Sequence, residues 1–344
     1  MKKKISLWLA RAPLGDQEGV ALIAVLWIFI FLFVVAFEFS TSAREEATAA
    51  QRFSDETLGY YLALAGFERG LYDFLNQQSP AAQTAQAPEA KKNDPFDGEF
   101  HEEDLGTGAF RVRLVDESGK ININRVNDET LRRIFTNLGL DEARRDILAD
   151  SIMDWRDADD LHRTNGAEND YYASLSPPYS AKNGPLDSVE DLLWIKGMTP
   201  ELFFGYSDET SQPANGSAPT ALREIFTVDS PIDRVNLRTA SAEVIHALTG
   251  IALEKCRGFV EERKKLSEKS LADLLPLLGI GAADSAMQAF IFTNPSVIAV
   301  EAEGRPSGSR MARKVKGVLR LGGGQGFEIL RWLDRYLGPV NTAP

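Results

Sequence analysis

The most uniform hydrophobic pattern lies near the N-terminus, where residues 20–37 form eighteen consecutive positions without a charge. A helix rises about 1.5 Å per residue, so this run covers most of a hydrocarbon core of roughly 30 Å. Positive charges at residues 2–4 and at Arg11 precede the run, and such charges hold their end of a span in the cytoplasm. We therefore predict one membrane-spanning helix, with everything after Glu38 on the far side of the membrane.

After Glu38 the pattern changes from uniformly apolar to amphipathic. Apolar residues recur at steps of three and four with charged residues between them, which is the period of a helix with one buried face. We expect one helix over residues 20–77, about 85 Å long, whose first half lies in lipid and whose second half packs on a domain. The apolar positions of the second half are Phe53, Leu58, Tyr61, Leu62, Ala65, Phe67, Leu71, Phe74 and Leu75.

The rest of the chain predicts an α+β fold in which a helical block interrupts a sheet. Residues 78–109 show no apolar period and predict a flexible loop. Alternating apolar and polar positions predict strands within 110–124 and 293–338, whereas residues 125–292 are almost wholly helical in pattern. Strands from both ends would share one antiparallel sheet against the long helix, and 125–292 would form an inserted all-helical domain.

One short pattern occurs twice inside the helical block. Each copy predicts a short strand, an N-cap residue that opens a helix, and a glycine turn before a second helix. Such units resemble helix-hairpin-helix modules, some of which offer backbone amides to DNA phosphates. The matched positions are 121–123 with Asn127, Glu129, Leu131 and Ile134, and 235–237 with Ser241, Glu243, Ile245 and Leu248.

Net charge and cysteine content narrow the functional classes. The formal charge of −12 argues against non-specific binding to nucleic acid, because neutralising phosphates needs clustered Lys and Arg. The first hairpin turn lies beside Asp141 and Glu142, so we expect the repeated units to pack helices rather than bind DNA. The single cysteine, Cys256, cannot form an internal disulfide and is expected to be buried, so core packing and a bound ion are the candidates for holding the fold.

Catalytic motifs do not emerge from the sequence. His101, His162 and His246 are far apart, and neither a Gly-x-Ser-x-Gly elbow nor a phosphate-binding loop occurs. The glycines within 322–326 precede strand-like sequence, which favours a hairpin turn. We predict that the chain is not an enzyme.

Carboxylates gather after a predicted helix that ends near residue 154. Aspartates at i and i+2 on an irregular backbone can turn their oxygens toward one point, and a later glutamate, a glycine turn and carbonyls can complete the six to eight oxygen ligands of Ca²⁺. The twelve-residue EF-hand loop is missing, so a solvated acidic loop is the alternative. The oxygen-bearing side chains are Asp154, Asp157, Asp159, Asp160, Glu168, Asn169 and Asp170.

The start of the apolar run resembles the junction cut by prepilin peptidase, in which a glycine precedes the hydrophobic segment. On that resemblance residues 1–19 are a leader, cleavage follows Gly19, and Val20 becomes the first mature residue; an uncleaved membrane anchor is the alternative. Most pilins and pseudopilins carry glutamate at the fifth mature position, where this chain has Ala24. A buried carboxylate is costly unless paired, so a subunit without one does not need the neighbour that would supply its partner.

The alanine at this position and the passage 151–201 resemble the K minor pseudopilins of type II secretion systems (the general secretion pathway protein K family). The segments Ser151-Ile-Met-Asp-Trp-Arg-Asp-Ala-Asp-Asp and Gly166-Ala-Glu-Asn-Asp-Tyr-Tyr look like the calcium-binding inserted domain of that family. The likeness extends through residues 235–240. Arg125 and Arg238 depart from the family pattern, because they stand where a small polar residue is expected.

The resemblance implies a structural calcium ion in a pilin-like protein. The first-choice ligands are Asp157, Asp159, Glu168 and Asp170, with Asp154 as a further ligand and with Asp160 or Asn169 contributing through a carbonyl or water.

The resemblance also implies where the chain works and with what. It implies a single-pass protein of the bacterial inner membrane with its bulk in the periplasm, processed by prepilin peptidase and methylated at its new terminus. Its partners would be the minor pseudopilins I and J and the inner-membrane secretion platform. It would initiate and cap the pseudopilus tip for export of folded proteins. The rival interpretation is a membrane-tethered periplasmic binding protein that joins no filament.

Overall fold

The computed structural model describes residues 18–77, 96, 98–205, 220–264, 275–281, 285–322 and 326–334. The chain divides into two compact units, Met1–Thr57 and Leu58–Pro344. Most of the predicted leader and much of the predicted loop 78–109 lie outside the described residues, as does the end of the predicted strand region 293–338.

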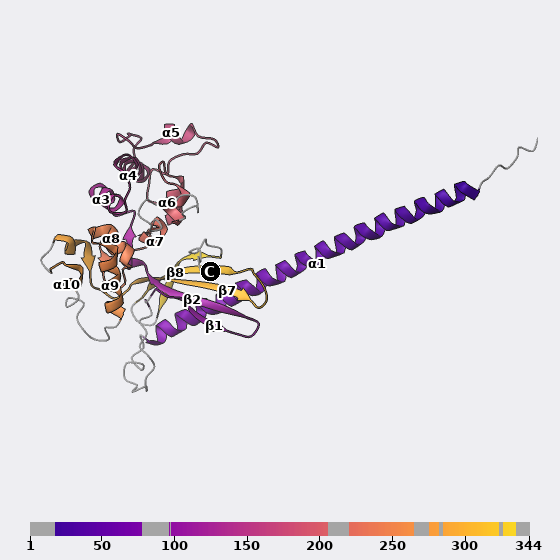
Figure 1. Cartoon of the computed structure of the whole chain (residues 1–344). Coiled ribbons are helices and arrows are strands. Elements are labelled where there is room, and N and C mark those ends of the chain that lie inside the picture. Colours follow the sequence, from indigo (N-terminus) through magenta and orange to yellow (C-terminus); the bar gives the residue numbers. More distant parts are fainter. Residues whose placement is uncertain are drawn as a thin grey trace, which may run out of the picture. The chain divides into compact units, whose positions relative to one another are not determined.

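The first unit contains the N-terminal part of helix α1 (Glu18–Gln77), drawn in indigo in Figure 1. Its large apolar side chains from Leu22 to Phe39 are exposed. Among the described residues, α1 is the helix long and apolar enough to cross a membrane. Such a surface is favourable in hydrocarbon and unfavourable in water, so the structure supports the predicted N-terminal membrane helix.

The second unit contains a five-stranded antiparallel sheet in the order β1-β2-β7-β8-β9. Burial in β2 alternates along the strand, as expected for one face on a core. The long apolar helix and the antiparallel sheet confirm the predicted mixed helix and strand class. The strands are β1 (His101–Asp104), β2 (Gly108–Asp116), β7 (Val297–Pro306), β8 (Arg313–Leu321) and β9 (Phe327–Leu333).

Strand β1 lies where the sequence pattern predicts part of the loop 78–109. Its sequence, His-Glu-Glu-Asp, has no apolar alternation, so a hydrophobic pattern cannot detect it. Its backbone pairs with β2 from His101 opposite Val112 to Asp104 opposite Ala109, while its side chains stay largely exposed. Hydrogen bonding to an existing strand, rather than apolar burial, therefore produces this strand.

The C-terminal part of α1 covers one face of the sheet (Figure 1). Glycines permit a close approach, because a Cβ on Gly66 would lie 2.7 Å from the ring of Phe110. On the sheet, a Cβ on Gly304 would overlap the Gly59 oxygen and the Ala63 nitrogen of the helix. The buried core of this contact comprises Ala63, Phe67, Leu71, Phe74, Phe110, Val112, Leu114, Ile298, Val300, Ala302, Val315 and Leu319.

Between β2 and β7 the chain forms a lobe with its own apolar core. The lobe is less helical than the pattern predicts, since two short parallel ladders and long irregular segments connect its helices. Polar and glycine-rich sequence between the helices cannot sustain an apolar helical face. Its elements are η1 (Glu117–Gly119), β3 (Ile121–Asn122), α3 (Asp128–Asn137), α4 (Glu142–Arg156), α5 (Asn169–Ala173), η2 (Val189–Trp194), α6 (Pro200–Phe204), α7 (Leu222–Ile225), β4 (Phe226–Thr227), β5 (Val235–Asn236), α8 (Ala242–Thr249), α9 (Leu253–Lys264), α10 (Leu275–Leu278), η4 (Ser285–Ala289) and β6 (Phe290–Ile291).

Equivalent positions of the repeated sequence pattern make equivalent contacts in this lobe. Each copy begins on a two-residue parallel ladder, β3 with β4 and β5 with β6. Asn122 Nδ2 donates to the carbonyl of Ser230 at 2.7 Å, and Asn236 Nδ2 donates to that of Thr293 at 2.9 Å. The side chains therefore tie each copy to the segment that follows its partner strand.

An arginine then braces the turn between strand and helix in each copy. Arg156 in α4 donates to the carbonyls of Ile123 and Val126. Arg263 in α9 donates to the carbonyls of Leu237 and Ala240, both at 2.8 Å. Backbone acceptors that a strand-to-helix turn leaves unpaired are thus satisfied in the same way twice.

A Gly304→Ala substitution tests the close contact between α1 and the sheet. We expect a loss of about 1–3 kcal/mol in the free energy of unfolding, because backbone atoms of α1 cannot yield to the added methyl. Denaturant titration of the detergent-solubilised chain measures it. The matched control is Gly258→Ala in α9, where a Cβ meets nothing within 4 Å and a gain of up to about 1 kcal/mol is expected. Equal effects of the two substitutions would contradict the described contact.

Candidate functional site

Three of the predicted ligand residues converge beside the end of helix α4. Asp157 is the C-cap residue of α4, Asp159 lies in the segment that follows, and Glu168 is the N-cap residue of α5. One carboxylate oxygen from each lies within 4.8 Å of the others. A helix end and a helix start therefore face each other across a turn and bring three negative charges together.

The carboxylates of this group, named here the acidic triad (Asp157, Asp159 and Glu168), are poorly satisfied within the protein. Glu168 is 1% exposed, and neither of its carboxylate oxygens has a hydrogen-bond partner, nor does the buried Oδ1 of Asp157. Burial, reinforced by Asp154 and Asp157, raises the pKa of Glu168 to about 7. Burial and then Asp159 also raise the pKa of Asp157.

These raised pKa values define how the triad affects folding in the absence of a cation. An acid whose pKa is higher in the folded than in the unfolded protein stabilises the fold below its unfolded value, and that stabilisation is lost as pH rises. For Glu168 the loss spans pH values from about 4.5 to about 7. At neutral pH the triad therefore opposes folding unless a positive charge binds it.

Asp154 and Asp170 lie outside the triad. Asp154 is fully buried and accepts the backbone N–H of Arg163 at 3.2 Å, while the Arg163 Nε lies 3.3 Å from its other oxygen. The Asp170 side chain is 73% exposed and lies 2.9 Å from His162 Nε2. Side-chain nitrogens of Arg163 and His162 thus already contact these two carboxylates, of which the sequence predicts Asp170 as a first-choice ligand and Asp154 as a further one.

Asn183 is a neighbour of the triad that the sequence analysis did not single out. Its Nδ2 donates to Asp160 Oδ1 at 3.1 Å and to the carbonyl of Asp159 at 3.3 Å. Its Oδ1 is buried without a partner, and its φ of 47° is in the left-handed region that asparagine tolerates. The signal available in the sequence was the Asn-Gly pair at 183–184, which favours such a turn.

The loop that carries Glu168 is held in place by contacts from outside it. Lys196 Nζ donates to the carbonyls of Asn165 and Gly166 at 3.2 and 2.8 Å. Gly166 has no room for a side chain, because a Cβ would overlap the Asp154 carboxylate. The triad is therefore a preorganised set of oxygens, and an all-oxygen donor set with unpaired carboxylates suits a hard cation such as Ca²⁺.

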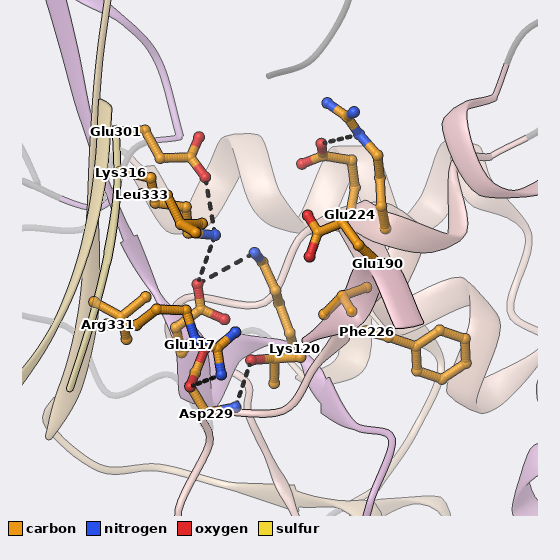
Figure 2. Close-up of a pocket in the computed structure, with 14 residues that line it drawn as sticks. Glu117, Lys120, Glu190, Glu224, Phe226, Asp229, Glu301, Lys316, Arg331 and Leu333 are labelled. Atoms are coloured by element: carbon orange, nitrogen blue, oxygen red, sulfur yellow. Dashed lines mark hydrogen bonds and ion pairs between the residues drawn. The ribbon is translucent and has the colours of Figure 1, made fainter. Parts of the chain in front are cut away.

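A second charged cluster lies where the lobe meets the sheet, in a cavity of about 50 Å³ (Figure 2). Glu117, 2% exposed, lies 3.4 Å from Lys316 Nζ and 3.5 Å from Lys120 Nζ. Lys316 also lies 3.3 Å from Glu301. Burial alone would raise the pKa of Glu117, but the two ammonium groups lower it to about 2.

Arg331 in β9 extends the same cluster by an ion pair with Asp229 at 3.1 Å, also visible in Figure 2. Carboxylates and cations alternate, so each buried charge faces an opposite one. This pattern is that of a structural joint between β7, β8 and β9 and the lobe, rather than of a site with a free reactive group.

Cys256 is fully buried, as expected, and burial raises the pKa of its thiol to about 11. A protonated, enclosed thiol is a poor nucleophile.

An apolar N-terminal helix whose other end packs on an antiparallel sheet, with a lobe inserted between two strands, defines the class of a membrane-anchored protein of mixed helix and strand fold. Residues 112–205, which include the acidic triad, match the sequence model of the family described as type II secretion system (T2SS), protein K. This part of the chain is therefore similar to protein K of type II secretion systems.

Two relatives are also similar to this chain. Type II secretion system protein K of Klebsiella pneumoniae is 28% identical over 207 residues, and a putative protein K of Escherichia coli K12 is 27% identical over 207 residues. The alignments cover 54% and 55% of this chain, and the chain spans 60% of the length of each relative.

A solved structure shares the fold. One chain in the crystal structure of the GspK-GspI-GspJ complex from the type 2 secretion system of enterotoxigenic Escherichia coli matches with a TM-score of 0.53 and 17% identity. The match covers 85% of this chain and 98% of that chain.

The buried joint predicts a specific pH dependence. Because the folded pKa of Glu117 is about 2, its ion pairs stabilise the fold above about pH 4.5 and are lost as pH falls toward 2. Glu117→Gln should reduce the free energy of unfolding at pH 7 by about 3 kcal/mol and flatten its decline between pH 5 and 3.

Urea titrations at a series of pH values measure both effects. Glu328→Gln is the control, because Glu328 and its partner Arg320 are 66% and 56% exposed and such pairs contribute at most about 1 kcal/mol. Equal losses in the free energy of unfolding for Glu117→Gln and Glu328→Gln would contradict a stabilising role for the buried ion pairs of Glu117.

Proposed function

We propose that the chain is a minor pseudopilin of a type II secretion system, anchored in the bacterial inner membrane with its bulk in the periplasm. The observation that carries the proposal is α1 itself: an exposed apolar segment suited to lipid continues into a segment that packs on an antiparallel sheet. A subunit built this way can join a bundle of similar helices and can leave the membrane without refolding. The match of residues 112–205 to the protein K family model supports the same assignment.

The N-terminal junction is proposed to be processed by prepilin peptidase. Gly19 and Val20 lie in the first turns of α1, and cleavage between them would place Ala24 at the fifth mature position. An apolar residue there can pack among other helices without needing a charged partner. Methylation of the new terminus and docking on the inner-membrane secretion platform belong to the same proposal.

We place the chain at the pseudopilus tip, with the minor pseudopilins I and J as its partners. The supporting observation is the lobe inserted between β2 and β7, which adds a second core to the sheet domain. A body of this size would hinder subunits from adding above it, whereas subunits below are unaffected. The chain would therefore initiate and cap assembly for export of folded proteins.

Inside the lobe, the two repeated units are proposed to be helix-hairpin-helix-like modules used for packing. The sequence predicts an inserted domain over residues 125–292 and sheet regions over 110–124 and 293–338. In the described residues the sheet also contains β1, and the lobe begins directly after β2, with η1 and β3.

Calcium is the proposed ligand of the acidic triad. The three carboxylates lie close together, and Asp157 and Glu168 have buried oxygens without hydrogen-bond partners, so a cation is needed to balance them at neutral pH. The neighbouring Asn183 Oδ1 offers a further neutral donor. Asp154 and Asp170, first considered as ligands from the sequence, would act instead by holding the loop through Arg163 and His162. Calcium would supply structural stability and no chemistry.

A membrane-tethered periplasmic binding protein that joins no filament is the second candidate. It would share the membrane helix and the lobe, and the two differ in leader processing and in assembly.

One purification tests the assignment. The chain is co-expressed with prepilin peptidase and with I-type and J-type minor pseudopilins, extracted in mild detergent and purified through a C-terminal tag. We expect an intact mass that begins at Val20 and stoichiometric recovery of both partners. An intact leader together with recovery of the chain alone would support the tethered binding protein instead.

Calcium binding is tested by thermal unfolding of the detergent-solubilised chain with excess Ca²⁺ or with chelator. A ligand at about 100 times its Kd adds about 2.7 kcal/mol, which corresponds to a rise in Tm of roughly 5–10 °C for a domain of this size. Asp159→Ala and Glu168→Gln should each abolish the rise. Asp170→Asn, outside the triad, should retain the rise in Tm. Loss of the rise in Asp170→Asn would refute the ligand assignment, as would a rise that persists in the triad variants.

A further inference from the structure

A groove with a cavity volume of about 560 Å³ runs between the two repeated units of the lobe. Three arginines line it: Arg125 from the turn between β3 and α3, Arg133 from α3, and Arg234 at the start of β5. We infer that this groove is a docking site for an acidic, partly apolar segment of a partner protein. The inference is independent of whether the chain caps a filament.

The three arginines are exposed and carry uncompensated charge. Among the described residues, none of them makes an ion pair, and Arg133 donates only to the Thr130 hydroxyl, at 3.3 Å. Arg132, the neighbour of Arg133 on α3, instead pairs with Asp128, Asp146 and Asp150. Acidic partners are therefore present in this region, but they pair with Arg132 and not with the arginines of the groove.

The charge of the groove is opposite in sign to the net charge of the chain. The whole sequence has a formal charge of −12, yet Asp233 is the one acidic residue among the described residues that line the groove. A local positive field on an acidic protein attracts an acidic segment.

Apolar residues line part of the groove: Ile121, Val126, Val235, Leu248, Ala286 and Ala289. A peptide can place an aliphatic side chain against these residues and its carboxylates beside the arginines, whereas a nucleic-acid backbone has no aliphatic side chain to place there. Arginine around an apolar centre is the composition of a protein interface.

The arginines project from a rigid frame. Arg125 N donates to the Asn122 carbonyl at 3.0 Å, and Arg156 holds the carbonyls on either side of it, at residues 123 and 126. Arg234 precedes the ladder of β5 with β6. Because little backbone ordering remains to be lost on binding, the groove is preorganised for its ligand.

The test uses the full chain in uncharged detergent and a fluorescein-labelled peptide of four Glu-Glu-Leu repeats, followed by fluorescence anisotropy. We expect saturable binding that weakens as NaCl is raised. A triple variant, Arg125→Glu, Arg133→Glu and Arg234→Glu, should weaken binding at least about tenfold, since three charge contacts are reversed. Single Arg→Gln variants should each weaken it by about two- to fivefold.

The matched control carries Arg144→Glu, Arg257→Glu and Arg310→Glu, which make the same change in net charge at arginines outside the groove. This control should retain binding within about twofold, and thermal unfolding checks that both triple variants fold. A peptide of Glu-Glu-Ser repeats should bind more weakly, because it lacks the apolar anchor.

Equal weakening in both triple variants would reduce the effect to net charge and overturn the proposal. Tighter binding of an oligothymidylate of the same charge than of the peptide would overturn it in favour of a nucleic-acid site. Undetectable peptide binding at low salt would do so as well. None of these outcomes bears on leader cleavage or on recovery of the partner subunits.

Discussion

The antiparallel pairing of β2 with β7 is the contact on which the second unit of the chain depends. Nine residue pairs join the two strands, from Gly108 opposite Pro306 to Asp116 opposite Ile298. The chain therefore leaves the sheet for the lobe and returns from it at neighbouring points. The entropic cost of closing a connection rises only slowly with its length. A large lobe can therefore be inserted between two paired strands without disrupting the sheet. The face that α1 covers is built from the same two strands and β8.

Polar contacts then orient the lobe on the sheet. The Asp116 carboxylate at the end of β2 accepts hydrogen bonds from Ser118, from Asn236 Nδ2 at 2.8 Å and from Thr239 Oγ1 at 2.7 Å. The joint of Glu117 and Lys316 follows directly (Figure 2). Buried ion pairs add less net stability than apolar packing of equal volume, but a misplaced partner leaves an unpaired charge. In this chain they serve to select one orientation of the lobe on the sheet.

The lobe presents two surfaces of opposite charge on a shared apolar core. The acidic triad lies where α4 ends and α5 begins, and the arginine groove lies between the repeated units. In both surfaces a basic side chain donates hydrogen bonds to backbone carbonyls of a turn. Lys196 donates to the carbonyls of residues 165 and 166, and Arg156 donates to those of residues 123 and 126. Turns fixed in this way can carry unpaired charges whose mutual repulsion would otherwise displace them.

The sequence by itself determined those features that depend on near neighbours along the chain. An uncharged apolar run, the three- and four-residue period after it and the alternation in β2 each follow from local geometry, and the structure has the corresponding helix and strand. The sequence also located the stretch of carboxylates that contains the acidic triad.

Tertiary structure decided which segments distant in the sequence contact one another. Strand β1 exists because β2 offers it a hydrogen-bonding edge. Asp157 joins the triad whereas Asp170 pairs with His162, a choice set by how the loop folds back on α4. The arginine groove combines residues more than a hundred positions apart. Hydrophobic periodicity records which face of an element is buried, but not which other element buries it, and long-range packing alone supplies that information.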